Sequence, residues 1–149
     1  MKLEDEVRSR KFSSEAQKAH VNILFTSAWL NNQVMYLFKP YGLSTQQYNI
    51  LRILKGQYPN AAPLKLLTER MIDKMSNTSR LVEKLSQKKL VDRKTCKESR
   101  RQVDITLTEK GFKLVEELNE KVDKYHKSIN VLTNEEAKQL NDLLDKLRG

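Results

Sequence analysis

Apolar residues recur at steps of three and four along most of the chain, which predicts a succession of amphipathic helices. The first long pattern covers 13–38 and occupies more than one face of the expected helix. A helix that is apolar on several sides packs against several partners, so we expect this one to be a central strut. Two further long patterns, 109–132 and 134–147, predict a helical C-terminal third.

Short polar residues mark where these helices begin. Ser14, Ser44 and Thr133 each precede a Gln or Glu by three residues, which is the capping-box pattern, and Thr108 is a further N-cap candidate. Pro40 and the glycine that follows it at position 42 predict the end of the first long helix. The local chemistry therefore sets element boundaries that agree with the apolar periodicity.

The middle of the chain predicts two shorter helices in sequence. Leu64, Leu67, Met71 and Met75 follow helix spacing, with a turn expected near 72–74. The next helix buries Thr78, Leu81, Val82 and Leu85. Its opposite face carries Ser76, Asn77, Ser79, Arg80, Lys84 and Gln87.

A two-stranded hairpin follows. Residues 90–93 form a short strand, residues 102–107 alternate apolar and polar side chains, and 94–101 form the loop between them. Three helices and a hairpin in this order over 44–108 predict a winged helix-turn-helix, so the fold class is mainly α with a small β-hairpin wing. The flanking helices, 13–38 and 109–147, carry more apolar surface than one small core needs, which predicts dimerisation helices around the lobe. We expect residues 1–149 to form a single protomer.

Charge narrows the kind of partner. The 149 residues carry a formal charge of +9, and the sequence pI is about 9.6. Eight basic and two acidic residues lie in 84–101, so six of the nine net charges are in that segment. Such a balance indicates a polyanionic partner, either nucleic acid or a membrane surface.

The polar helix face and the basic loop together predict a DNA-binding surface. Arg80 can pair bidentately with guanine and Asn77 with adenine, while Lys84 and Lys88 can contact phosphates. The alternative is an ordinary solvated helix face beside a solvated loop; the position of the charge in a winged helix favours DNA. The predicted DNA-binding residues are Ser76, Asn77, Ser79, Arg80, Lys84, Lys88, Lys94, Lys97, Arg100 and Arg101.

Other classes of site find little support. His20 and His126 are too few and too far apart to predict a metal site, and we find no catalytic motif, so we expect neither enzyme activity nor a cofactor. The single cysteine, Cys96, excludes an intrachain disulfide. The sequence has no stretch like a signal peptide, and its most apolar run, 21–30, is too short to span a bilayer. We therefore expect a cytoplasmic protein.

Three segments resemble the MarR family of bacterial transcriptional regulators: LSTQQYNILRIL at 43–54, MSNTSRLVEKLSQKKLVDR at 75–93 and SRRQVDITLTEKG at 99–111. Their order and spacing match the family across 13–147. The resemblance implies a helical homodimer with two winged helix-turn-helix lobes that binds pseudo-palindromic operator DNA. Many members release DNA on binding a small anionic or phenolic ligand, or on cysteine oxidation.

The resemblance also implies roles for single residues. Arg100 matches the wing-tip position that enters the minor groove, and Arg101 would brace the wing or reach a phosphate. Lys89 stands where the family usually has a glycine; a lysine in a left-handed helix cap costs about 1 kcal/mol, which leaves open whether the helix ends differently here. Ser99 stands where the family tends to have the aspartate that orients the wing arginine.

Cys96 allows two interpretations. It lies in a loop near Lys94 and Lys97, which would lower its pKa and favour a redox switch. The redox-sensing members of the family carry their reactive cysteine near the start of the first long helix, where this chain has none. We therefore favour a bystander role for Cys96.

We carry three hypotheses for function. The first is sequence-specific double-stranded DNA binding by a homodimeric transcriptional regulator, a repressor that responds to a small-molecule effector. The alternative is a winged-helix module that docks another protein without sequence-specific DNA binding, and a third is a basic membrane-surface binder, which the distributed apolar faces disfavour. Trp29, Tyr36 and Tyr48 either line an effector pocket or belong to the core, and we favour the core.

Overall fold

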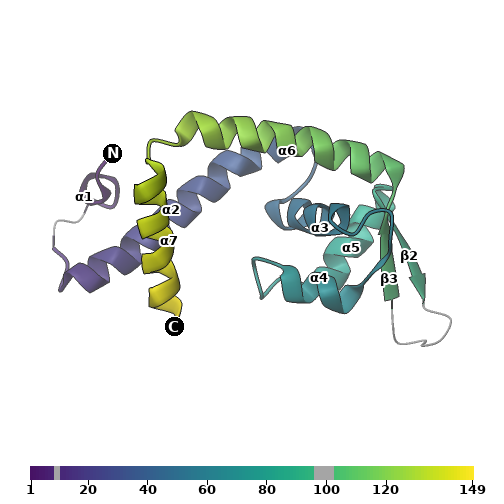
Figure 1. Cartoon of the computed structure of the whole chain (residues 1–149), viewed down its shortest axis with the longest axis horizontal. Helices are drawn as coiled ribbons and strands as arrows, with labels where there is room; N and C mark the ends of the chain where they lie inside the picture. The colour runs from purple at the N-terminus through teal and green to yellow at the C-terminus, as the bar shows by residue number, and fades with distance from the viewer. Residues whose placement is uncertain (9–10, 96–102) are drawn as a thin grey trace.

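The computed structural model describes residues 1–8, 11–95 and 103–149. Two long helices, α2 and α6, meet along part of their lengths, and a lobe of shorter helices and strands lies beneath the N-terminal part of α6 (Figure 1). The elements are α1 (Leu3–Glu6), α2 (Glu15–Phe38), the 3-10 helix η1 (Lys39–Tyr41), α3 (Thr45–Lys55), β1 (Ala62–Pro63), α4 (Leu64–Arg70), α5 (Thr78–Gln87), β2 (Val91–Thr95), β3 (Val103–Leu107), α6 (Glu109–Ile129) and α7 (Asn134–Arg148).

Helix α2 begins and ends where the sequence predicts. The Ser14 hydroxyl accepts a hydrogen bond from the Gln17 backbone N–H at 3.1 Å, and η1 ends at Gly42, which has a left-handed φ of 60°. The expected packing against several partners is met at the C-terminal end of α2, which contacts α3, η1 and α6. Phe38 is its one fully buried residue, and Val34 and Leu37 pack partly buried against the core. Leu24, Met35 and Tyr36 remain exposed.

Helix α3 is the centre of the core. Its capping box is confirmed, because the Gln47 backbone N–H donates to the Ser44 hydroxyl at 3.1 Å and the Ser44 N–H donates to the Gln47 side chain at 2.9 Å. Ile50, Leu51 and Leu54 are fully buried. Around them pack buried side chains of α2, α4, α5, α6 and the sheet: Phe38, Leu67, Val82, Leu85, Ile105, Leu107, Val115 and Leu118.

The sheet has three antiparallel strands in the order β1-β3-β2, so the fold is mainly helical as predicted but with one strand more than the hairpin. Ala62 pairs with Ile105 across β1 and β3. Lys94 is a second correction: it lies within β2, opposite Asp104, rather than in the loop. The pairing of β2 with β3 runs without a break from Val91 opposite Leu107 to Thr95 opposite Val103, so it includes Lys94.

The turn expected near 72–74 is confirmed, so the apolar spacing that runs from Leu64 on to Met75 does not continue as helix to its last member. Helix α4 stops at Arg70; Met71 is buried, whereas Met75 is 92% exposed. The chain turns because Asp73 holds it: its carboxylate accepts the Met75 backbone N–H at 3.0 Å, and its carbonyl accepts the Ser76 N–H at 3.2 Å. This turn separates α4 from α5.

The C-terminal end of α5 is fastened to the start of α6. Lys89 adopts a left-handed conformation with φ of 58°, so the helix ends as a glycine would end it although the residue is lysine. The Thr108 hydroxyl donates to the Lys89 and Leu90 carbonyls at 3.0 Å each, and it caps α6 by accepting the Gly111 N–H. Gly111 is required here, because a Cβ at this position would lie 2.1 Å from the Leu90 carbonyl oxygen.

Helix α7 is correctly predicted in its extent but buries no residue within the chain. Its capping box is confirmed: the Glu136 backbone N–H donates to the Thr133 hydroxyl, and the Thr133 N–H donates to the Glu136 carboxylate. None of the helices in the described ranges is long and apolar enough to cross a membrane. The same residues contain no cluster of His, Cys, Asp and Glu that could hold a metal ion.

Candidate nucleic-acid interface

The site is built on α5, the second helix of the predicted helix-turn-helix. Thr78, Val82 and Leu85 bury one face of it in the core. Asn77 is the N-cap: its side-chain oxygen accepts the Arg80 backbone N–H at 3.1 Å. The cap fixes where the helix begins, and therefore which side chains form its outward face.

The outward face of α5 and the start of α3 enclose an open hollow of about 430 Å³. Ser76, Asn77, Arg80 and Lys84 line it, so the structure brings together four of the residues predicted to bind DNA. Ser44, the N-cap of α3, and Gln46 in its first turn also line the hollow. Sequence reasoning missed these two as site residues, although the Ser44 capping box already placed a helix N-terminus there. The hollow therefore combines two helix starts with two basic side chains.

Its electrostatics suit a polyanion. Arg80 and Lys84 are exposed, and the ion pairs formed within the described part of the chain do not include them. Backbone amides at helix starts add positive potential. Asp73 is the one acidic residue lining the hollow; the Met75 N–H hydrogen bond, helped by Ser76 and Gln46, holds the pKa of its carboxyl below its ordinary value.

Lys88 does not line the hollow with the others. It is the C-cap of α5, and its backbone carbonyl accepts a hydrogen bond from the Lys110 ammonium at 3.1 Å. Its own ammonium lies against the end of η1, because a Cβ on Gly42 would be 3.0 Å from the Lys88 Nζ. Lys88 thus contacts both the first turn of α6 and the turn that follows α2 and η1. Ser79 is exposed on α5 but is also outside the hollow.

The predicted wing is described only at its base. Lys94 is exposed on β2. Lys97, Arg100 and Arg101 lie outside the described residues, as do Cys96 and Ser99.

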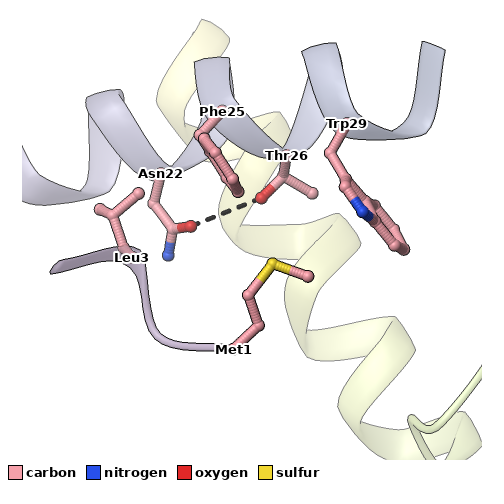
Figure 2. A pocket seen from close by; sticks show the side chains of 6 residues that line it. All are labelled: Met1, Leu3, Asn22, Phe25, Thr26 and Trp29. Carbon is pink, nitrogen blue, oxygen red and sulfur yellow. Dashed lines mark hydrogen bonds between the residues drawn. The ribbon is translucent and has the colours of Figure 1, made fainter. Parts of the chain in front are cut away.

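The three candidate pocket aromatics have different surroundings. Tyr48 is core: its ring packs on Phe38 with centroids 4.3 Å apart, its hydroxyl donates to the Asn119 side chain at 2.7 Å, and burial raises its pKa. Tyr36 is exposed on α2. Trp29 lines a second hollow, of about 190 Å³, with Phe25, Asn22 and Thr26 of α2 and with Met1 and Leu3 of the N-terminal segment (Figure 2).

The chain is similar in sequence to the HTH-type transcriptional regulator MgrA of Staphylococcus aureus. The two are 33% identical over 111 residues, which is 74% of each protein. No protein-family model matches the chain.

Its fold is similar to that of several solved regulators. A putative MarR-like regulator from Bacillus cereus superposes with a TM-score of 0.78 over 90% of this chain and 96% of that one, at 20% identity. MepR in the S. aureus MepR–DNA complex gives a TM-score of 0.77 over 92% of this chain and 97% of MepR, at 20% identity. NadR, solved with 4-hydroxyphenylacetate, gives a TM-score of 0.67 over 93% of this chain and 94% of NadR, at 25% identity.

Proposed function

Because the chain belongs to the MarR family of DNA-binding transcriptional regulators, we propose that it acts as a homodimer that binds operator DNA and represses transcription until an effector releases it. The observation that carries this proposal is the basic hollow at the start of α5, formed by Ser76, Asn77, Arg80 and Lys84. Such a regulator acts on chromosomal DNA, so its place of action is the cytoplasm. Enzyme activity is not part of this role.

DNA binding divides between two kinds of contact. The start of α5 enters the major groove, where Arg80 pairs with guanine and Asn77 with adenine. Ser79, Lys84, Lys88 and the α3 start face phosphates, with Lys94, Lys97, Arg100 and Arg101 of the wing segment extending the contact toward the minor groove. The similarity to MepR, which was solved bound to DNA, supports this arrangement.

A second copy of the chain covers the unpartnered helices. Leu24 and Tyr36 of α2 are 71% and 65% exposed, and Leu143 of α7 is 65% exposed although it belongs to a regular apolar stripe. Burial of such surface contributes about 25 cal/mol per Å², and an exposed stripe of this kind on a monomer marks an interface. Residues 13–38 and 109–147 thus form the dimerisation part and 44–108 the DNA-binding lobe.

The effector occupies the small hollow beside Trp29. Phe25, Leu3 and Met1 give it apolar walls, and the Thr26 hydroxyl and the Asn22 side chain add polar groups (Figure 2). These walls suit a single aromatic ring with small polar substituents, and NadR was solved with 4-hydroxyphenylacetate, which has one aromatic ring with a hydroxyl and a carboxymethyl group. By preferring a dimer whose two α5 helices are wrongly spaced for DNA, the ligand lowers operator affinity.

Binding to duplex DNA tests the first part of the proposal. Fluorescence anisotropy with duplexes selected from the source genome should give two protomers per site and affinity that falls at least about tenfold between 50 and 200 mM salt, as released counterions require. Absence of duplex binding at low salt, with a stable protein, would instead favour the alternative winged-helix role of docking another protein.

Sedimentation tests the dimer. Leu143→Glu places a charge in the exposed α7 stripe and should shift the protein toward monomer. Lys138→Glu lies on the opposite face of α7 by helix periodicity and should leave the dimer intact. A wild-type chain that sediments as a monomer at micromolar concentration would contradict the assignment of these helices.

Fluorescence tests the effector site, because Trp29 is the only tryptophan. Titration with 4-hydroxyphenylacetate as a probe should change its emission and lower operator affinity in parallel. Phe25→Ala should weaken both effects together, since it removes one wall of the hollow. An emission change without any effect on DNA binding would remove the regulatory role of this hollow.

A further inference from the structure

Two side chains in the turn between α4 and α5 leave large apolar surfaces in water. Met75 is 92% exposed and Ile72 is 83% exposed. Most other exposed large apolar residues of the described chain lie on α2, on α7 or beside them, where a second copy covers them under the proposed function. These two belong to the DNA-binding lobe, and neither the dimer nor the core accounts for them.

The position of Met75 distinguishes it from Ile72. Met75 directly precedes Ser76 and Asn77, which line the basic hollow and lead into α5, with Asn77 as its N-cap. In a helix-turn-helix, the N-terminal residues of the second helix contact base edges. Ile72 lies three residues earlier, where its backbone N–H is docked onto the Asn49 side chain of α3 at 2.9 Å.

The backbone beneath Met75 is held while its side chain is free. Asp73 accepts the Met75 N–H at 3.0 Å, and the next residue, Ser76, donates its N–H to the Asp73 carbonyl at 3.2 Å. An unbranched thioether chain adapts its shape to an apolar partner. The apolar group that DNA displays in the major groove is the 5-methyl group of thymine, whose contact with an apolar side chain carries sequence information.

We propose that Met75 is a specificity-determining residue that contacts a thymine methyl group at the edge of the sequence bound by α5. This inference rests on the proposed DNA-binding face of α5 and adds to it an apolar contact beside the polar ones of Asn77 and Arg80. It predicts a preference for thymine over cytosine, and over deoxyuridine, at one base step beside the bases that those two residues contact.

A coupling experiment with modified duplexes tests the contact. Duplexes enriched from a random library by the full-length wild-type protein are resynthesised with each thymine replaced in turn by deoxyuridine, which lacks only the methyl group. One replacement should weaken wild-type binding about three- to fivefold, the effect of one buried methyl group. The same replacement should have no effect on Met75→Ala, because the contact is already lost.

Ile72→Ala is the matched control. It removes a similarly exposed apolar side chain from the same turn and should keep the full sensitivity to deoxyuridine. A protein that enriches a defined sequence but shows no replacement whose effect depends on Met75 overturns this inference and leaves sequence-specific binding standing. A library without any enriched sequence overturns the proposed function, and the inference with it. Circular dichroism and sedimentation establish that both variants fold and assemble like the wild type.

Discussion

The close approach of α6 to the end of α5 leaves no room for a side chain at Gly111. Gly111 is buried in the first turn of α6. A Cβ added there would lie 2.1 Å from the Leu90 carbonyl oxygen, 3.0 Å from the Leu90 carbonyl carbon and 2.8 Å from a Leu107 methyl carbon. Two of these three atoms are backbone, so a change of side-chain rotamer cannot relieve the contact.

Two opposing effects decide the size of the Gly111→Ala perturbation. Alanine favours a helix over glycine by at most about 1 kcal/mol. Overpacking of a closed site costs about 1–3 kcal/mol, and an overlap of about 1 Å with backbone atoms places this site at the upper end. The clash therefore wins, and we expect a net loss of roughly 2 kcal/mol, which lowers Tm by roughly 4–8 °C for a chain of this size.

The same substitution should weaken DNA binding beyond its effect on stability. The Leu90 carbonyl oxygen that the new methyl group displaces also accepts hydrogen bonds from the Thr108 N–H and hydroxyl. Its displacement moves the end of α5 and tilts the outward face of that helix. Anisotropy at a temperature where both proteins are folded should thus show a lower duplex affinity for Gly111→Ala than for the wild type.

Gly56→Ala is the matched control, since its Cβ would meet its nearest atom, the Ile53 carbonyl oxygen, at an ordinary 3.4 Å and its φ is −66°. It should raise stability by about 0.4–1 kcal/mol through the unfolded state, with duplex affinity unchanged. Thermal unfolding followed by circular dichroism measures both variants. A Gly111→Ala protein as stable as Gly56→Ala would refute the close approach of α6 to Leu90.

Three further substitutions in the lobe have opposite or separable effects. Lys89→Gly should stabilise the protein by about 1 kcal/mol in chemical denaturation, because it relieves the left-handed backbone at φ of 58°; a destabilised variant would contradict this. Asn77→Asp keeps the N-cap and should raise stability by roughly 0.5 kcal/mol, while the new negative charge repels phosphate. Thermal unfolding should therefore show a higher Tm and anisotropy a lower duplex affinity. Thr78→Val removes a buried hydroxyl that has no hydrogen-bond partner among the described residues and should raise the free energy of unfolding by about 1 kcal/mol; a loss of stability would indicate that the hydroxyl is satisfied.

Features set by nearby residues could be predicted from the sequence. The helix starts at Ser14, Ser44, Thr108 and Thr133 depend on hydrogen bonds that span three residues, and each of these N-cap bonds forms. The reciprocal bond of the predicted capping box at Ser14 does not, because the Gln17 side chain accepts the Ser13 N–H instead. The four residues gathered in the hollow lie on α5 or within two residues of its start, so the sequence also predicted that they lie together. Local chemistry and periodicity carry this much information.

Features set by distant residues could not be predicted in this way. Strand β1 is two residues long and exists because Ala62 meets Ile105; it has no local pattern. Met75 continued an apolar period that the hydrogen bonds of Asp73 interrupt. Ser44 and Gln46 join the site only because the core sets α3 beside α5. The exposure of apolar residues on α2 likewise depends on how the distant elements α3 and α6 pack against that helix.

Arginine substitution on α5 tests the central claim, that this face binds specific DNA. Anisotropy at one fixed salt concentration compares an enriched duplex with a scrambled one for the wild type, Arg80→Ala and, as a control arginine on α7, Arg148→Ala. We predict that Arg80→Ala loses about five- to 150-fold in affinity for the enriched duplex, the value of one bidentate base contact, and much less for the scrambled one, whereas Arg148→Ala changes neither. Equal losses on both duplexes, or no loss on the enriched one, would contradict base-specific binding by α5.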